Sequence, residues 1–295
     1  MISILLPIYN YPCSALLDNL YEQAFHLGVP FEIIAYEDGS TLYTHQNKAT
    51  AERLHITYAQ LPQNIGRSAI RNKLASAAQY THLIFMDCDV MPASDQYISS
   101  YYQQIQQHSY DIVCGGRLMP SWHEIAPTFR LNWLTGYHRE SAHSNKRAHF
   151  LSNNFLIRKE IFRTIQFEES LRHYGHEDTL FGIAARKQAF KISYCENPVI
   201  HAGLEDNATF LDKTNQGLQN LLFLKKHFLS PDEVNQIKLL RVYDRLQQLH
   251  LHELIRTIAK CINPTLAWLL IHKKPNLYLL DWYKLGQVTL LDRKV

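Results

Sequence analysis

The chain of 295 residues lacks the marks of several protein classes. Its five cysteines show no CxxC spacing, which argues against a zinc ribbon or a disulfide framework and favours reduced thiols in a cytoplasmic setting. With only 11 Gly and 11 Pro, it has no low-complexity segment and no internal repeat. The apolar start has no basic region before it, so we interpret it as a first strand and not as a signal peptide. No uninterrupted apolar run reaches the roughly 18–20 residues that a membrane span needs, so none is expected.

A strong excess of charge is also missing, because the net charge is only +3. The charge is unevenly placed: residues 218–295 hold 12 Lys and Arg against 6 Asp and Glu, so this tail is +6 and the rest of the chain is −3. A basic tail of this kind suits an anionic membrane, a nucleic acid or plain solvent. No motif in the chain indicates a nucleic-acid partner, and none is expected.

What the chain does contain is an alternation of strands and helices. Short apolar runs such as "ISILLPIY", "FEIIAYE" and "HLIFM" alternate with segments of helical periodicity through the first half. This pattern predicts an α/β fold with a doubly wound, mostly parallel sheet flanked by helices. Beyond residue 217 the pattern is helical with a break at Ser230-Pro231, so residues 218–295 are expected to form a helical C-terminal extension.

Two aspartates close the apolar run in "LIFMDCDV". In a parallel sheet, ligands bind beyond the carboxyl ends of the strands. Alternate strand residues share a face, so Asp87 and Asp89 are expected to point the same way. Convergent carboxylates form a hard oxygen site that suits Mg²⁺ or Mn²⁺. The alternative is that both acids only cap the helix that follows Pro92.

Two further segments carry polar groups toward the same sheet edge. "YEDGS" ends a strand in acids, with Gly39 supplying a tight turn. "NIGRSAIRN" places Gly66 before a helix on which Arg67 and Arg71 share one face. A basic face near an acidic crevice suits phosphates or a nucleotide. A plain turn and a solvated helix face remain the structural alternatives.

Taken together, these segments resemble the family 2 glycosyltransferases of the GT-A fold. The resemblance covers about residues 2–203 and rests on five motifs in the family's order: "SILLPIYN", "YEDGS", "NIGRSAIRN", "FMDCDV" and "GHEDTLF". It implies a domain over residues 1–217, in which about 1–116 bind a nucleotide-sugar and about 117–217 bind the acceptor and hold the catalytic base. The residues that it implies for the nucleotide-sugar are Pro7, Tyr9, Glu37, Asp38, Asn64, Gly66, Arg71, Asp87 and Cys88.

The resemblance also implies a metal ion and a general base. Asp89 would bind Mn²⁺ or Mg²⁺ directly, with Asp87 and His201 as further ligands, although most of the 16 histidines are expected to be structural. Asp178 would take the proton from the acceptor hydroxyl, with Glu177 beside it. The alternative for this acidic pair is to stabilise the start of a helix.

Acceptor residues are expected in and near the aperiodic segment 117–148. Trp122, Trp133 and His176 are the candidates, because aromatic faces suit sugar CH groups, and core packing is the competing explanation. "SNNFLIRKEIF" and "GHEDTLF" also resemble the acceptor half of galactosyl- and N-acetylgalactosaminyltransferases. In the tail, a region with Trp268, Trp282 and three lysines (Lys273, Lys274, Lys284) suits an anionic membrane.

The expected activity is an inverting, metal-dependent transfer of a sugar from a nucleotide-sugar, with UDP favoured, to a saccharide or lipid-linked saccharide in cell-surface polysaccharide synthesis. The expected location is the cytoplasm or the inner face of the membrane. The absence of a Gln-x-x-Arg-Trp motif argues against a processive membrane synthase. A non-catalytic nucleotide-sugar-binding scaffold is the main alternative. A sugar-1-phosphate nucleotidyltransferase is weaker, since "PIYNYP" lacks a glycine-rich phosphate loop, and an oxidoreductase would need GxGxxG.

Overall fold

The computed structural model describes residues 1–107, 110–141, 150–171, 174–273 and 275–292. The chain divides into two compact units. The first unit comprises Met1–Pro120, Arg139–Ser170 and Glu177–Gly203, and the second comprises Ser121–His138, Leu171–His176 and Leu204–Val295. This division differs from the expected boundary after residue 217, because helix α8 (Asn207–His227) runs through that position without a break.

The first unit is built on a seven-stranded sheet with the order β3-β2-β1-β4-β8-β6-β9. All neighbouring pairs are parallel except those of β8, which is antiparallel to both β4 and β6. The expected α/β fold with a mostly parallel sheet is therefore confirmed. Its strands are β1 (Ile2–Ile8), β2 (Phe31–Glu37), β3 (Thr57–Gln60), β4 (His82–Met86), β6 (Ile112–Cys114), β8 (Asn154–Arg158) and β9 (Ile192–Tyr194).

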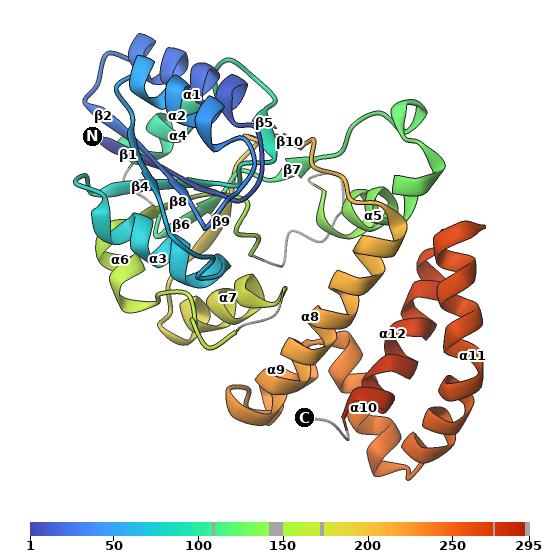
Figure 1. The fold of residues 1–295 in the computed structure, drawn as a ribbon. Helices are drawn as coiled ribbons and strands as arrows, with labels where there is room; N and C mark the ends of the chain where they lie inside the picture. The colour runs from blue at the N-terminus through green and yellow to red at the C-terminus, as the bar shows by residue number, and fades with distance from the viewer. Residues whose placement is uncertain (108–109, 142–149, 172–173, 274, 293–295) are drawn as a thin grey trace. The chain divides into compact units, whose positions relative to one another are not determined.

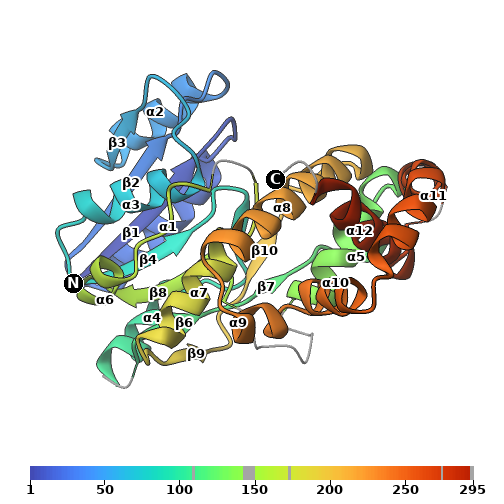
Figure 2. The same cartoon turned by 90° about the horizontal axis from the view of Figure 1, so that it is seen from below.

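Helices cover both faces of this sheet (Figures 1 and 2). One face carries α1 (Ser14–His26) and α4 (Tyr97–Gln106), with α2 (Thr44–Arg53) beside α1, and the other carries α3 (Arg67–Ala77), α6 (Lys159–Thr164) and α7 (Glu177–Lys187). Successive strand residues point to opposite faces of the sheet, so each strand contributes side chains to a hydrophobic core on either face. Ile4 and Leu6 pack into the α1–α4 core, whereas Leu5, Phe85 and Phe155 pack into the α3–α7 core.

A second, three-stranded sheet in the first unit has the order β5-β10-β7. It consists of β5 (Val90–Pro92), β10 (Val199–His201) and β7 (Arg117–Leu118). β10 runs antiparallel to β5 and pairs His201 with Val90. Val90 directly follows Asp89 in the chain. The pairing therefore brings Asp89 close to His201, although these two residues are 112 positions apart.

One buried amide joins the two sheets. Asn154 Oδ1 accepts hydrogen bonds from the hydroxyls of Tyr97 and Tyr101 at 2.8 and 2.6 Å. Its Nδ2 donates to the backbone oxygens of Gly116 and Asn197, at 2.9 and 2.8 Å. The residue is 1% exposed, and both its acceptor and its donor capacity are used. Asn154 therefore fixes the chain that enters β7 and the chain that leads to β10.

The second unit is helical. Its helices are α5 (Arg130–Thr135), α8, α9 (Pro231–Gln236), α10 (Lys238–Gln248), α11 (His252–His272) and α12 (Leu277–Leu291), and short 3₁₀ turns cover Trp122–Glu124 and Pro127–Phe129. A π turn at Gly136–Glu140 leads back toward the first unit along the chain. The expected break at Ser230-Pro231 is confirmed, because Ser230 and Glu233 form a capping box at the start of α9.

The expectation that no helix could span a membrane needs a correction. α11 has 21 residues, and its best 18-residue window has a mean hydropathy of 1.3, so it is long and apolar enough by length and composition alone. α11 contains no unbroken apolar run of this length, because Arg256, Lys260 and Asn263 interrupt it, but these residues do not bring the mean hydropathy below the level of a possible span. Only 22% of that window is buried within the protein.

Asn154→Ala should destabilise the first unit strongly. It removes one hydrogen-bond partner from two buried tyrosine hydroxyls and from two backbone carbonyls, of which the Gly116 carbonyl keeps the N–H of Val199. Each group left unsatisfied costs about 1–3 kcal/mol. Urea unfolding should show a loss of at least about 3 kcal/mol, while Gln103→Ala, on the exposed side of α4, should cost less than about 0.5 kcal/mol. Equal midpoints for the two variants would contradict the role of this amide.

Candidate active site

The end of β2 holds a neighbouring loop in place through Asp38. Its carboxylate accepts hydrogen bonds from the backbone N–H groups of Ile65 and Gly66, at 2.7 and 3.1 Å. Burial raises the pKa of Asp38, and these two hydrogen bonds act against the rise. Gly39 has φ +71°, and a Cβ there would lie 2.3 Å from the backbone nitrogen of Asn64. Only glycine permits this close approach, so the turn and the loop form one wall.

The residues expected around the nucleotide differ in accessibility. Tyr9 is 54% exposed, Asn64 is exposed and Pro7 is partly covered, so all three are open to a ligand. Glu37 is fully buried: it accepts hydrogen bonds from Asn47 at 2.8 Å and from the Tyr58 hydroxyl at 3.0 Å. Glu37 therefore braces the strand end from inside and does not face the crevice.

A chain of ion pairs joins α3, the end of β4 and α7. Arg71 Nη2 contacts Asp87 Oδ1 at 2.5 Å, and Arg67 Nη2 lies 3.4 Å from Asp87 Oδ2. Arg67 Nε also donates to Glu177 Oε1 at 2.6 Å. Arg67 thus connects an acid from the donor-side strand to the first residue of α7.

The two arginines of α3 have different surroundings, which corrects the expectation that Arg71 contacts the nucleotide. The side chain of Arg71 is only 2% exposed and is held by Asp87, the Arg67 carbonyl and the face of the Phe167 ring. The side chain of Arg67 is 43% exposed. Arg67 is therefore the α3 residue that a bound phosphate can reach.

The second aspartate of the "DCD" segment faces a different partner. His201 Nε2 lies 3.2 Å from Asp89 Oδ2, and the backbone N–H groups of Ala202 and Gly203 donate to the Asp89 carbonyl. A Cβ on Gly203 would lie 2.6 Å from the Asp89 Cβ, so this glycine leaves room for the carboxylate. Burial acts to raise the pKa of Asp89, but the hydrogen bond from His201 and the charges of His201, Arg67 and Arg117 outweigh it and hold the pKa below its ordinary value.

Asp89 and His201 fit a divalent cation. Asp89 Oδ1 is buried and has no hydrogen-bond partner, which is costly unless a ligand completes it, and His201 Nε2 lies beside the same carboxylate. An oxygen and an imidazole nitrogen suit Mn²⁺ and, less closely, Mg²⁺. The described residues contain no group of three or more His, Cys, Asp or Glu around one point, so water and a diphosphate would supply the remaining ligands.

Asp87 does not join this pair, which corrects the expectation of two convergent carboxylates. β4 ends at Met86, so the alternation of a strand no longer applies to positions 87 and 89. The positive charge that Asp87 requires comes from Arg71 and Arg67. Cys88, between the two acids, packs against the α1–α4 core, and a hydrogen bond between the thiols raises the pKa of Cys13. Cys88 is therefore a partly buried residue that packs against this core, and its contact with the nucleotide-sugar stays a prediction.

The acidic pair at the start of α7 has two different pKa values. Burial alone would raise the pKa of Glu177, but the charges of Arg67 and Arg71 outweigh it and hold the pKa below its ordinary value. Burial, together with the negative charges of Glu177 and Glu140, raises the pKa of Asp178 to about 7. Two neighbouring carboxyls with separated pKa values are typical of an acid–base site.

The expected acceptor residues all lie in the second unit. Trp122 and Trp133 meet edge to face with ring centroids 4.8 Å apart, and Tyr137 stacks on Trp133 at 4.6 Å. Arg130 lies over the Trp122 ring at 4.8 Å. Trp133 is 7% exposed and is packed among these rings, whereas Trp122 is 36% exposed. His176 has φ +70° and directly precedes Glu177 in the chain.

One buried residue near the site was not anticipated. The Asn153 side chain is 7% exposed, and neither its oxygen nor its nitrogen has a hydrogen-bond partner. Its carbonyl accepts the N–H of Asp87 at 3.1 Å, so it lies beside the end of β4. The sequence pattern does not distinguish the two neighbouring asparagines. The side chain of Asn154 makes four hydrogen bonds, whereas that of Asn153 makes none.

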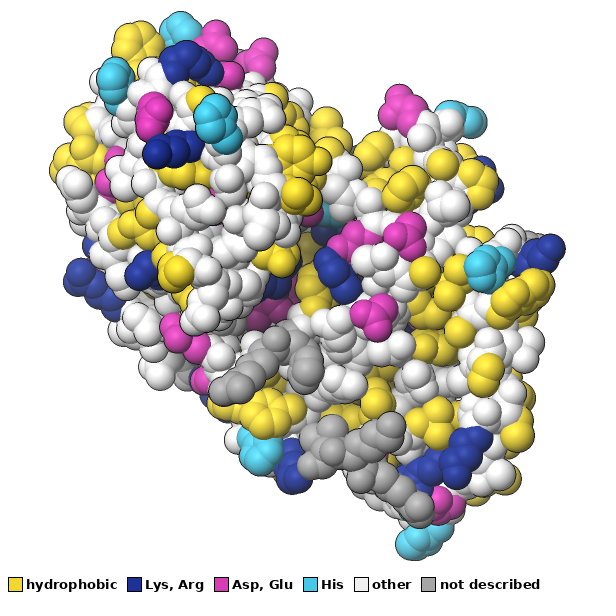
Figure 3. Space-filling model, in the orientation of Figure 1, with side chains coloured by type: hydrophobic (Ala, Val, Ile, Leu, Met, Phe, Trp, Pro, Cys, Tyr) yellow, Lys and Arg dark blue, Asp and Glu magenta, His cyan; other side chains and the backbone are white. Residues whose placement is uncertain are grey.

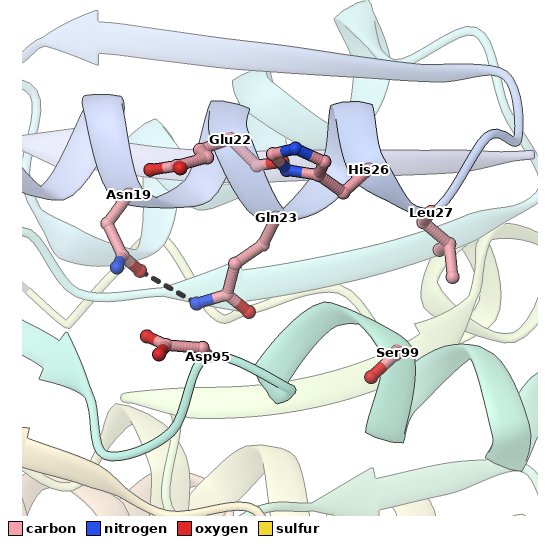
Figure 4. Close-up of a pocket in the computed structure, with 7 residues that line it drawn as sticks. All are labelled: Asn19, Glu22, Gln23, His26, Leu27, Asp95 and Ser99. Carbon is pink, nitrogen blue, oxygen red and sulfur yellow. Dashed lines mark hydrogen bonds between the residues drawn. The ribbon is translucent and has the colours of Figure 1, made fainter.

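A pocket of about 430 Å³ lies elsewhere in the first unit, between α1 and the start of α4 (Figure 4). Its polar lining is already paired: Gln23 Nε2 donates to Asn19 at 2.9 Å and to the Ser94 carbonyl at 3.2 Å. His26 Nδ1 lies 2.8 Å from the Glu22 carbonyl. None of the candidate site residues lines this pocket, and we assign it no role.

Comparison with known proteins agrees with this geometry. Residues 3–166 match the model of the family described as glycosyl transferase family 2. The mannosyltransferase PcManGT from Pyrobaculum calidifontis, solved with GDP-Man and Mn²⁺, is similar over 99% of this chain and 86% of its own, with a TM-score of 0.61 and 15% identity. TarS 1-349 from S. aureus, solved with UDP-GlcNAc, is similar over 99% and 90%, with a TM-score of 0.52 and 16% identity. These likenesses identify the fold as GT-A. No curated protein matches in sequence.

The two aspartates should respond differently to the same substitution. Asp89→Asn should weaken Mn²⁺ binding, measured by electron paramagnetic resonance, by about ten-fold or more, because it removes a negatively charged oxygen ligand. Asp87→Asn should leave Mn²⁺ affinity nearly unchanged but lower the free energy of unfolding by about 3–5 kcal/mol, since it leaves buried Arg71 without its counter-ion. The assignment fails if Asp87→Asn is the variant that loses the metal.

Proposed function

The chain belongs to glycosyl transferase family 2 and is a glycosyltransferase, and we propose that it transfers a sugar with inversion from a nucleotide-sugar, with UDP favoured, to a saccharide or lipid-linked saccharide. We place this activity in cell-surface polysaccharide synthesis at the cytoplasmic face of the membrane. Support for the donor class comes from the wall formed by Asp38 and the loop at Gly66 at the carboxyl end of the sheet, where ligands of such folds bind.

The observation that carries the proposal is the pair of separated pKa values at the start of α7. Glu177 stays ionised because Arg67 binds it, while the pKa of Asp178 lies at about 7. A group with this pKa can accept a proton at neutral pH and release it again afterwards. Asp178 would take the proton of the acceptor hydroxyl as that hydroxyl attacks the anomeric carbon.

The remaining residues serve the leaving group. Asp89 and His201 would hold Mn²⁺ or Mg²⁺, which when bound would neutralise the charge that develops on the departing diphosphate. The partly exposed guanidinium of Arg67 can add a second positive charge there. The same guanidinium holds Glu177, and the Thr179 N–H donates to Asp178 at 2.7 Å, so the base has a fixed orientation.

Asp178→Asn tests this proposal against a non-catalytic scaffold. The amide cannot accept the proton, so transfer should fall by about 10²–10⁴-fold while nucleotide-sugar binding persists. A panel of UDP- and GDP-sugars with Mn²⁺, read by thermal shift and by sugar release, would identify the donor and provide the assay. Asp95→Asn, an exposed acid before α4, is the matched control and should keep full activity. Undiminished turnover in Asp178→Asn would refute the role of the base.

The pKa of Asp178 also sets a pH dependence. Because only the deprotonated carboxylate accepts a proton, kcat/KM should rise with pH up to about 7 and then level off.

Stability should change with pH in the opposite direction. The pKa of Asp178 in the folded protein lies above its ordinary value of 3.8, so between pH 3.8 and about 7 the folded state binds a proton that the unfolded state has released. The free energy of unfolding should therefore fall as pH rises through this range, and Asp178→Asn should not show this fall. Melting curves of both proteins at several pH values measure this difference.

A further inference from the structure

The outward face of α11 is apolar. Five residues along it and at its N-cap are 41–56% exposed: Leu251 41%, Leu254 56%, Ile258 43%, Ile262 47% and Trp268 49%. At 3.6 residues per turn these positions fall on one side of the helix. The other residues on this side include Cys261, Thr265 and Leu269, so no charged residue interrupts the face from Leu254 to Leu269. Figure 3 shows hydrophobic side chains gathered over the region of α11 and α12.

The inward face of α11 mixes polar, small and apolar residues, and its buried positions are Arg256, Ala259, Asn263 and Leu270. Arg256 is 6% exposed, and its Nε donates to the Thr289 carbonyl of α12 at 2.7 Å. Asn263 Nδ2 donates to the Tyr283 carbonyl at 3.1 Å. Gly286 allows the two helices to approach, since a Cβ there would lie 2.6 Å from Asn263 Oδ1. α11 therefore turns two polar side chains toward α12 and presents large apolar groups on its outward face, while Leu270 also packs inward and Glu253 and Lys260 are exposed beside that face.

The inward polar pair, Arg256 and Asn263, and the outward apolar face are two features that helices in apolar surroundings share. Helices in lipid pack through small residues and polar groups, and they present large apolar side chains to the acyl chains. One end of the α11–α12 hairpin adds aromatic and basic groups: Lys273 Nζ lies 5.6 Å from the Trp268 ring centroid, and Tyr278 and Trp282 are 81% and 64% exposed. Tryptophan and tyrosine favour the membrane–water interface, where lysine attracts anionic headgroups.

We propose that the outward face of α11 docks on an anionic lipid bilayer and lies in the plane of its interface. A spanning hairpin does not fit, because α12 has 15 residues and carries Asp281 and Lys284. At 1.5 Å per residue it is about 22 Å long, less than the roughly 30 Å of the hydrocarbon core. A second copy of the chain is the other candidate, but it would bring two tails of charge +6 together, whereas an anionic bilayer is complementary to them.

Binding of the full chain to vesicles tests the proposal. The probe vesicles contain phosphatidylglycerol and phosphatidylcholine in one set and phosphatidylcholine alone in the other. The protein should float with the anionic vesicles and less with the neutral ones. Ile258→Ser with Ile262→Ser should lower the partition coefficient by about ten-fold or more, since binding scales with the buried apolar area. The matched control is Phe25→Ser with Leu42→Ser, two exposed apolar residues of the first unit, and it should bind like the wild type.

Three results would overturn the proposal. They are no flotation with anionic vesicles, equal flotation of the Ile258/Ile262 variant and the wild type, and a dimer in solution that this variant dissociates without any vesicle binding. Thermal melting identifies an unfolded variant, and single Ile258→Ser then replaces the pair. The proposal is independent of the proposed reaction, because Mn²⁺ and nucleotide binding without vesicles should be the same in all these variants.

Discussion

The ion pairs of Arg67 are the interaction on which the arrangement of the site depends. One guanidinium contacts Asp87, at the end of a central strand, and Glu177, at the start of α7. These two acids are 90 positions apart and would repel each other without a cation between them. With Arg67 in place, the acceptor-side helix is held against the donor-side strand end, and Asp178 is fixed as the next residue. The same contact keeps Glu177 ionised, so its charge contributes to the raised pKa of Asp178.

The acids of the site consequently divide into two kinds. Asp38 and Asp87 have both oxygens engaged by backbone amides or guanidinium groups, and they hold the sheet edge together. Glu37 supports the same edge through Oε1, which accepts from Asn47 and Tyr58, while its Oε2 has no partner. Asp89 and Asp178 keep capacity for a ligand: Asp89 has an oxygen without a partner, and Asp178 has a pKa at about 7. Burial of Asp38 and Asp87 costs little because both oxygens of each carboxylate are paired, whereas the unpaired oxygen of Asp89 is available to a ligand.

In the second unit, too, buried polar side chains are hydrogen-bonded. α11 turns Arg256 and Asn263 toward the backbone of α12 and leaves leucine, isoleucine and tryptophan outside. In water alone this arrangement would expose apolar area without a compensating gain, which is the physical reason for the proposed docking of this face on lipid. A transferase attached in this way would stay close to an acceptor that is itself carried on lipid.

The amino-acid sequence by itself determined the strand–helix alternation, the mostly parallel sheet, the family motifs and the acidic pair of α7, because periodicity and short motifs are local properties. It did not reveal α2, whose buried residues are the polar or small Asn47, Thr50 and Ala51, so no apolar stripe marks that helix. The tertiary structure alone decided which acid meets which cation. Asp87 and Asp89 are alike in the sequence, but the strand ends at Met86, so one meets Arg71 and Arg67 and the other meets His201. Such pairings depend on where distant elements pack, which no local pattern contains.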